Sequence, residues 1–204
     1  MIPRPAIELI IKFEVGNRAY YSKLLEHPVY RNEEQGIIIG IGYDLATVYK
    51  AQLLWDWQEN INPNYFPLLF RVLGLKGNAA RQILGADLQK VTIPFLNAYE
   101  VFAKRAIPRA YLMTKHIYPN LDDLSPEVKG ALVSLVFCRG NSLEGDSREE
   151  MREIVQLAAE KDYEGIADAI ERSKRHFEVK GLDEQVLRRE AEADLIYESI
   201  KKSS

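Results

Sequence analysis

The sequence predicts an α+β protein that is mostly helical and has a small antiparallel β-sheet near the N-terminus. Apolar residues close to the start recur three and four positions apart, which is typical of one face of a helix. Isoleucines interrupted by glycines, GIIIGIGYDLA over residues 36–46, indicate extended backbone. From Thr47 onward almost every segment has helical periodicity.

The first helix is predicted from three isoleucines that share one face, Ile7, Ile10 and Ile11. Glu14 is the next position on that face, and Gly16-Asn17 supplies a stop. Between Tyr20 and Asp44 the pattern changes to short extended pieces around RNEEQG, which favours a small β-hairpin or meander.

The remaining segments are predicted as a series of helices. Thr47 is expected to cap a helix that carries Leu53, Leu54 and Trp57. Trp55 and Trp57 are two positions apart and cannot share a helix face, so one of them is expected to be exposed. Further helices are predicted over residues 64–73, 78–84 and 92–118, the last kinked or broken at Pro108.

Capping residues mark the later helices. Ser125-Pro126-Glu127 predicts a helix that ends near Gly140. Ser147 and Glu150 have the spacing of a capping box. Three further expectations concern residues 162–190: Asp162 and Asp183 cap the last two helices, and Arg188, Arg189 and Glu190 form a surface and inter-helix ion-pair set.

Composition narrows the classes of function. The chain has 204 residues, enough for one domain or two closely packed lobes, and its net charge of −3 gives no reason to expect nucleic acid as a partner. One cysteine, Cys138, excludes an intrachain disulfide, and three scattered histidines make no metal-ligand spacing, so we expect no metal and no cofactor.

The N-terminal segment predicts no signal peptide, because its longest apolar run, residues 9–11, stops at Lys12. No segment approaches the ~20 apolar residues that a membrane span needs. We therefore expect a protein made in the cytoplasm, without a membrane span and monomeric.

The glycine-interrupted stretch is predicted to have two different faces, because side chains alternate across a strand. One face carries Ile37, Ile39, Ile41 and Tyr43. The other carries Ile38, the bare backbone of Gly40 and Gly42, and the carboxylate of Asp44. Glycine within a strand often marks a place where a ligand approaches.

Two carboxylates are candidates for chemistry. Glu14 continues an isoleucine face, and burial would raise its pKa and suit a general acid; alternatively it lies at a helix end and reaches water. Asp44 ends the glycine face, where it could act as a base or stabilise positive charge; alternatively it caps a turn. Two carboxylates beside a bare-backbone groove are what glycoside hydrolysis requires.

Five blocks of the sequence resemble a known family. They are FEVGNRAYY, IIGIGYDL, ALVSLVFCRG, GDSREEMREI and LRREAEADLIY, and the last resembles an Arg-Arg-x-x-Glu signature. In this order they resemble the lysozymes of phage type, and most closely their pesticin-like muramidase branch.

The resemblance implies a two-lobed lysozyme fold in one domain, residues 1–204. The small β-containing lobe would cover about residues 18–46, and residues 1–17 and 47–204 would form the helical lobe and the connecting helix. It also implies that Glu14 is the general acid, that Asp44 positions water or stabilises charge, and that a glycan strand of peptidoglycan is the partner. The substrate-binding positions would be Ile38, Gly40, Gly42, Tyr43, Cys138 and Arg139, with loop capping as the alternative for Arg139.

Two positions depart from the family pattern. The pattern Thr-Ile-Gly-x-Gly-Tyr-Asp has a threonine where this chain has Ile38. At position 138 the family usually has asparagine or glutamine, and this chain has Cys138, whose thiol is a weaker hydrogen-bonding group. The chain is therefore expected to be a muramidase, with a degenerate module that binds glycan or a protein partner as the alternative. Without a signal peptide, it would act at the cell wall only if released or exported by another system.

Overall fold

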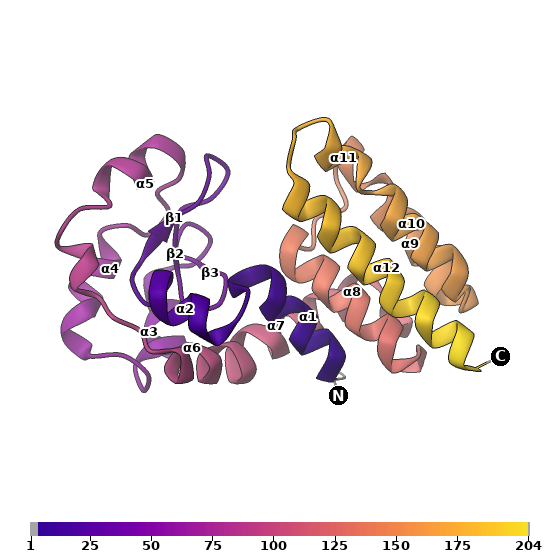
Figure 1. Ribbon diagram of the computed structural model, residues 1–204, viewed down its shortest axis with the longest axis horizontal. Helices are drawn as coiled ribbons and strands as arrows, with labels where there is room; N and C mark the ends of the chain where they lie inside the picture. The colour runs from indigo at the N-terminus through magenta and orange to yellow at the C-terminus, as the bar shows by residue number, and fades with distance from the viewer. Residues whose placement is uncertain (1–3, 204) are drawn as a thin grey trace. The chain divides into compact units, whose positions relative to one another are not determined.

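The computed structural model describes residues 4–203 (Figure 1). The chain forms two compact units. Unit 1 comprises Met1–Phe13 and Arg109–Ser204, and unit 2 comprises Glu14–Pro108. The sheet thus belongs to a unit that continues well beyond residue 46. The prediction of a mostly helical α+β chain with a small antiparallel sheet near the N-terminus is confirmed.

Unit 2 contains the sheet and the short helices around it (Figure 1). Helix α1 (Arg4–Val15) enters it at Glu14 and is followed by α2 (Arg18–Leu24). The later elements are α3 (Lys50–Trp57), η1 (Pro63–Tyr65), α4 (Phe66–Phe70), α5 (Gly77–Ile83), η2 (Leu88–Lys90), α6 (Phe95–Val101) and the π-helical η3 (Phe102–Ala106).

The sheet has three antiparallel strands in the order β1 (Val29–Tyr30), β2 (Ile37–Ile39) and β3 (Tyr43–Asp44). In the pairing of β2 with β3, Ile38 lies opposite Asp44 and Ile39 opposite Tyr43. Directly opposed residues of antiparallel strands project from the same face. Ile38 and Asp44 therefore share one face.

The prediction that residues 36–46 form one continuous two-faced strand is wrong. Gly40 and Gly42 have φ of 57° and 68°, in the left-handed region that glycine adopts readily. They turn the chain back, so the stretch is a hairpin with residues 40–42 at its tip. Ile37 to Ile39 are all buried, so β2 has no bare face.

The prediction of extended backbone from Tyr20 onward is wrong for residues 20–24, which belong to α2, because Asn17 caps a new helix as well as following the stop at Gly16. Gly16, with φ of 67°, follows the last residue of α1. The Asn17 side chain then accepts a hydrogen bond from the Tyr20 backbone N–H at 2.9 Å and caps α2. One short segment thus ends one helix and begins the next.

The helix after the sheet begins later than expected. Thr47 does not cap it, because its hydroxyl donates to the Asp44 carbonyl oxygen and α3 begins at Lys50. The prediction for the two tryptophans is confirmed: Trp57 is 1% exposed and Trp55 is 62% exposed.

The segment around Pro108 is helical throughout and is not broken. The π-helical η3 precedes α7 (Ile107–Ile117), in which the chain passes from unit 2 to unit 1. Proline lacks an N–H and clashes with the carbonyl four residues earlier. The wider π-helical turn just before Pro108 accommodates both effects.

Unit 1 is helical in its described part. After α7 come η4 (Pro119–Asp123), α8 (Pro126–Arg139), η5 (Asp146–Arg148), α9 (Glu149–Glu160), α10 (Tyr163–Arg172), α11 (Arg175–Glu178) and α12 (Asp183–Ser203). Helix α12 packs against α8 and α10 (Figure 1). None of the helices within residues 4–203 combines the length and apolar character of a membrane span.

The helix caps in unit 1 were predicted in part. Ser125 accepts a hydrogen bond from Val128 N–H, Asp162 accepts one from Gly165 N–H, and Gly140 ends α8 with φ of 73°. These three predictions are confirmed. The capping box at Ser147 is wrong, because α9 begins at Glu149. Asp183 is the first residue of α12 itself.

The prediction of a surface and inter-helix ion-pair set is correct for Glu190 and wrong for Arg188 and Arg189. Both side chains are buried, and they pair with Glu192, which is also buried. Ser134 of α8 donates to Glu192 at 2.5 Å, so the group joins two helices. Glu190 lies outside the group and pairs with Lys174 at 2.9 Å.

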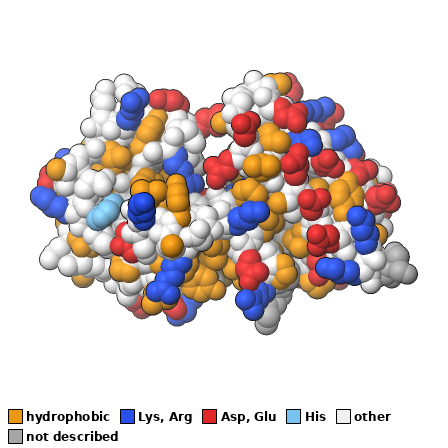
Figure 2. Space-filling view, in the orientation of Figure 1, with side chains coloured by type: hydrophobic (Ala, Val, Ile, Leu, Met, Phe, Trp, Pro, Cys, Tyr) orange, Lys and Arg blue, Asp and Glu red, His pale blue; other side chains and the backbone are white. Residues whose placement is uncertain are grey.

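The surface of unit 1 mixes charges of both signs. Acidic and basic side chains alternate over its helices on the face drawn in Figure 2. The exposed pairs within the unit include Arg172 with Glu153 and Arg175 with Glu149. Each such exposed pair contributes little to stability.

Candidate active site

Glu14 lies one residue before the end of α1, and its side chain is 11% exposed. Its carboxylate oxygen Oε2 is 3.5 Å from Nη1 of Arg31, and Nη2 of Arg31 donates to the Glu14 carbonyl oxygen. Arg31 thus contacts both the side chain and the backbone of Glu14. These contacts hold the helix end against the segment between β1 and β2.

The carboxylate of Glu14 packs against the hairpin tip at Gly42. A Cβ atom built on Gly42 would lie 2.6 Å from Oε2 of Glu14 and 2.9 Å from its Cδ, distances that real Cβ atoms do not adopt. The absence of a side chain at Gly42 therefore leaves the space that the carboxylate occupies. The hairpin requires glycine here both for its φ and for this contact.

We expect Gly42→Ala to lower the free energy of unfolding by more than its backbone strain alone explains. Left-handed backbone costs a non-glycine residue about 1–2 kcal/mol, and the new methyl group must also displace the Glu14 carboxylate. Gly74→Ala is a matched control, because Gly74 has φ of 75° and a Cβ there would meet nothing within 4 Å. Denaturant titration should show a larger loss of stability for Gly42→Ala; equal losses would contradict the role of the contact.

Asp44 has one carboxylate oxygen engaged in local structure. Its Oδ1 accepts from the backbone N–H of Ala46 at 2.8 Å and of Gly36 at 3.1 Å. Its Oδ2 accepts no hydrogen bond from any residue in the range 4–203. The turn-capping interpretation of Asp44 is therefore correct for one of its two oxygens.

Ile38 lies beside Asp44 and is 2% exposed. Here the neighbour of the carboxylate is a hydrocarbon side chain in contact with the interior. Asp44 therefore receives no hydrogen bond from the side chain opposite to it.

Two predicted substrate-binding residues contact the core. A Cβ atom on Gly40 would lie 2.6 Å from the Trp57 ring, so Gly40 makes room for this tryptophan. Tyr43 is buried, donates to Asp56 at 2.8 Å and meets Trp57 edge to face, with ring centroids 5.4 Å apart. In the structure both residues support the hairpin from its inner side.

Cys138 and Arg139 belong to unit 1, at the end of α8. The Cys138 thiol donates to Oε1 of Gln185 at 3.0 Å. The Arg139 guanidinium donates to the Ser147 carbonyl oxygen and lies 5.2 Å from the centroid of the Phe177 ring. Burial, together with Arg148 and Arg189, lowers the pKa of Arg139 to about 10. These contacts match the alternative expected for Arg139, which is to hold the loop after α8.

Arg31 is the residue of this site that sequence reasoning missed. It stands in the turn-like segment RNEEQG, where a charged residue is ordinary. No periodicity connects it with Glu14. Only the packing of the β1–β2 segment on the end of α1 brings the two together.

A carboxylate paired with a guanidinium, and a second carboxylate on the same hairpin, suit acid–base or binding chemistry. Within residues 4–203 no three His, Cys, Asp or Glu side chains are grouped so that they could hold a metal ion. Two of the hollows in the described part of unit 2 measure about 240 Å³ each, and neither is lined by Glu14 or Asp44. The candidate site is thus the Glu14–Arg31 pair on Gly42, with Asp44 on the same hairpin.

No family model matches the chain, and no curated protein matches it.

Proposed function

We propose that this chain is a muramidase that hydrolyses the glycan strand of peptidoglycan, with Glu14 as general acid. The observation that carries the proposal is the Glu14 carboxylate, 11% exposed and packed on the bare backbone of Gly42, in the hairpin that also holds Asp44. Glycoside hydrolysis uses two carboxyl groups, one of them a general acid, and Glu14 contacts the hairpin that carries Asp44. The sequence blocks that resemble phage-type lysozymes also support it.

Each residue has a distinct task in this mechanism. Glu14 protonates the leaving oxygen of the glycosidic bond. Asp44 uses its second oxygen, Oδ2, to orient the attacking water or to stabilise the oxocarbenium-like transition state. Arg31 positions Glu14 through the 3.5 Å ion pair and the backbone contact. Action at the cell wall follows release or export from the cytoplasm by another system.

A specific observation favours a second candidate, a lysozyme-like module that binds glycan or a protein partner without cleaving it. Ile38 faces Asp44 across the strand pair, and Oδ1 of Asp44 is already bound to two backbone N–H groups. A water beside Asp44 therefore lacks the hydroxyl partner that threonine would provide. Loss of that partner reduces catalysis while leaving a surface for binding.

Incubation with purified peptidoglycan distinguishes the two candidates. A muramidase releases soluble fragments with new N-acetylmuramic acid reducing ends, which mass spectrometry identifies. A binding module sediments with the insoluble wall and releases none. Sedimentation without new reducing ends would reject the enzymatic proposal.

We expect Ile38→Thr to raise hydrolysis above the parent, alone or together with Cys138→Asn. Threonine keeps the β-branching that suits a strand and restores a hydroxyl beside Asp44. Groups that position a proton transfer typically contribute about 10²–10⁴-fold, so even partial recovery is measurable as reducing ends per minute.

The matched control is Ile39→Thr. It makes the same change at the next residue, which is also buried but projects from the opposite face. Ile39→Thr should give no gain. If neither Ile38→Thr nor the double variant is faster than the parent while both are folded by circular dichroism, the missing hydroxyl does not limit the reaction.

A further inference from the structure

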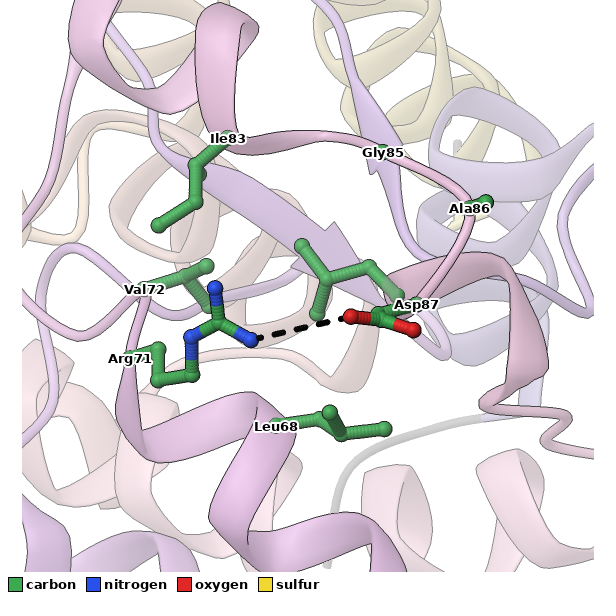
Figure 3. Close-up of a pocket in the computed structure, with 8 residues that line it drawn as sticks. Leu68, Arg71, Val72, Ile83, Gly85, Ala86 and Asp87 are labelled. Carbon is green, nitrogen blue, oxygen red and sulfur yellow. Dashed lines mark ion pairs between the residues drawn. The ribbon is translucent and has the colours of Figure 1, made fainter.

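A hollow of about 240 Å³ lies in unit 2 between the end of α4, the end of α5 and the loop before η2 (Figure 3). Its apolar lining comes from Leu68, Val72, Ile83 and Leu88. Dry apolar cavities of about 150 Å³ already hold a benzene molecule. The hollow is therefore large enough for a branched aliphatic side chain and the groups attached to it.

Two opposite charges face each other at this hollow. Figure 3 shows the side chains of Arg71 and Asp87 pointing toward one another, and Nη1 of Arg71 is 4.0 Å from Oδ2 of Asp87. Both side chains are more than half exposed. An exposed pair at this separation contributes little to stability, so a ligand can enter between the two groups at small cost.

Both charged groups have unused hydrogen-bonding capacity. Within residues 4–203, the Arg71 guanidinium donates no hydrogen bond. Asp87 accepts one from Lys90 through Oδ1, at 2.7 Å, and its Oδ2 accepts none in the described part of the chain. The hydrogen bond and charge of Lys90 lower the pKa of Asp87, so this carboxylate stays ionised near neutral pH.

The three features correspond to the three parts of one kind of molecule. A guanidinium binds a carboxylate through paired N–H groups, and a carboxylate binds an ammonium. An apolar lining binds an aliphatic chain. A ligand with a single charge would satisfy one of the facing groups and repel the other.

We propose that this hollow binds an apolar α-amino acid. Its carboxylate would pair with Arg71, its ammonium with Oδ2 of Asp87, and its side chain would contact Leu68, Val72 and Ile83. Two sources offer this chemistry: a free amino acid such as leucine, and the unlinked end of diaminopimelate in wall peptides. The second source rests on the proposed function.

Titration of the ¹⁵N-labelled protein with leucine, followed by NMR, tests the proposal. A ligand this small should bind with a dissociation constant of roughly 1 mM. Isocaproate lacks the ammonium of leucine and isoamylamine lacks its carboxylate; each should bind at least about tenfold more weakly, because a charge-assisted hydrogen bond is lost. No binding of leucine, or equal binding of the three compounds, would overturn the proposal.

Variants assign the binding to this hollow. Arg71→Gln and Asp87→Asn change exposed side chains, and each should weaken leucine binding at least about tenfold. Ile83→Phe fills the hollow from a partly exposed position and should also weaken binding. The control is Arg81→Gln, which removes an exposed arginine of α5 that does not line the hollow. Leucine binding that none of the first three variants weakens would place the ligand elsewhere and reject the site.

Two wall fragments separate the possible sources. One muropeptide carries diaminopimelate with a free end, and the other carries lysine, which lacks the terminal carboxylate. Tighter binding of the diaminopimelate fragment than of leucine assigns the site to wall peptides, and the opposite order assigns it to free amino acids. Binding is measured without turnover, so its failure is distinguishable from failure of the muramidase proposal.

Discussion

Replacement of Glu14 by glutamine is expected to lower peptidoglycan hydrolysis by about 10²–10⁴-fold, the usual contribution of a general acid. Glutamine has nearly the shape of glutamate but cannot supply the proton that the leaving oxygen needs. The side chain can still lie on Gly42, so the fold should be retained. The measurement is the rate of appearance of reducing ends on purified walls, with circular dichroism to verify folding.

Glu8→Gln is the matched control for this experiment. Glu8 belongs to the same helix, is 60% exposed and pairs only weakly with Arg4 on the surface. The control should keep the parent rate. If Glu14→Gln also keeps the parent rate, Glu14 is not the general acid. If the parent protein itself hydrolyses no peptidoglycan, the binding candidate is favoured.

The largest expected effect on stability is that of Glu192→Gln in unit 1. Glu192 and its partner Arg189 are both 0% exposed, and Arg188 lies in the same group. The substitution removes the carboxylate that pairs with the buried Arg189 guanidinium at 2.8 Å. Removal of one partner of a buried ion pair typically costs about 3–5 kcal/mol. Denaturant titration followed by far-ultraviolet circular dichroism should show this loss.

Glu190→Gln makes the same change two residues earlier in α12. Glu190 is 39% exposed and pairs with Lys174, so its replacement should cost at most about 1 kcal/mol. Both tryptophans belong to unit 2, so their fluorescence reports on that unit separately. A Glu192→Gln protein as stable as the Glu190→Gln protein would show that the buried group contributes nothing to stability.

Local signals predicted most of the helices. Ser125, Asp162 and Gly140 act within one helical turn of their own positions, and the structure confirms all three. The same reasoning failed at Ser147, which lies inside the 3-10 helix η5, and at Thr47, where the loop continues until α3 begins at Lys50. A cap motif is necessary for many helix starts but does not decide where the loop before it ends.

The glycine-interrupted stretch shows where periodicity misleads. Alternation of side chains applies only to extended backbone, and Gly40 and Gly42 leave it with positive φ. The segment predicted as a two-faced strand is therefore a hairpin in the structure. Ile38 and Asp44 nevertheless lie on one face, because strand pairing sets them opposite each other.

The sequence by itself determined the helical class of the chain, the place of the sheet and the position of Glu14 near the end of the first helix. These depend on neighbours within a few residues. Only the tertiary structure decided that Arg31 holds Glu14, that its carboxylate occupies the space left by Gly42, and that Arg189 is buried with Glu192. Such contacts join residues far apart in the chain, and their free energy depends on burial and on approach distances that local patterns do not contain.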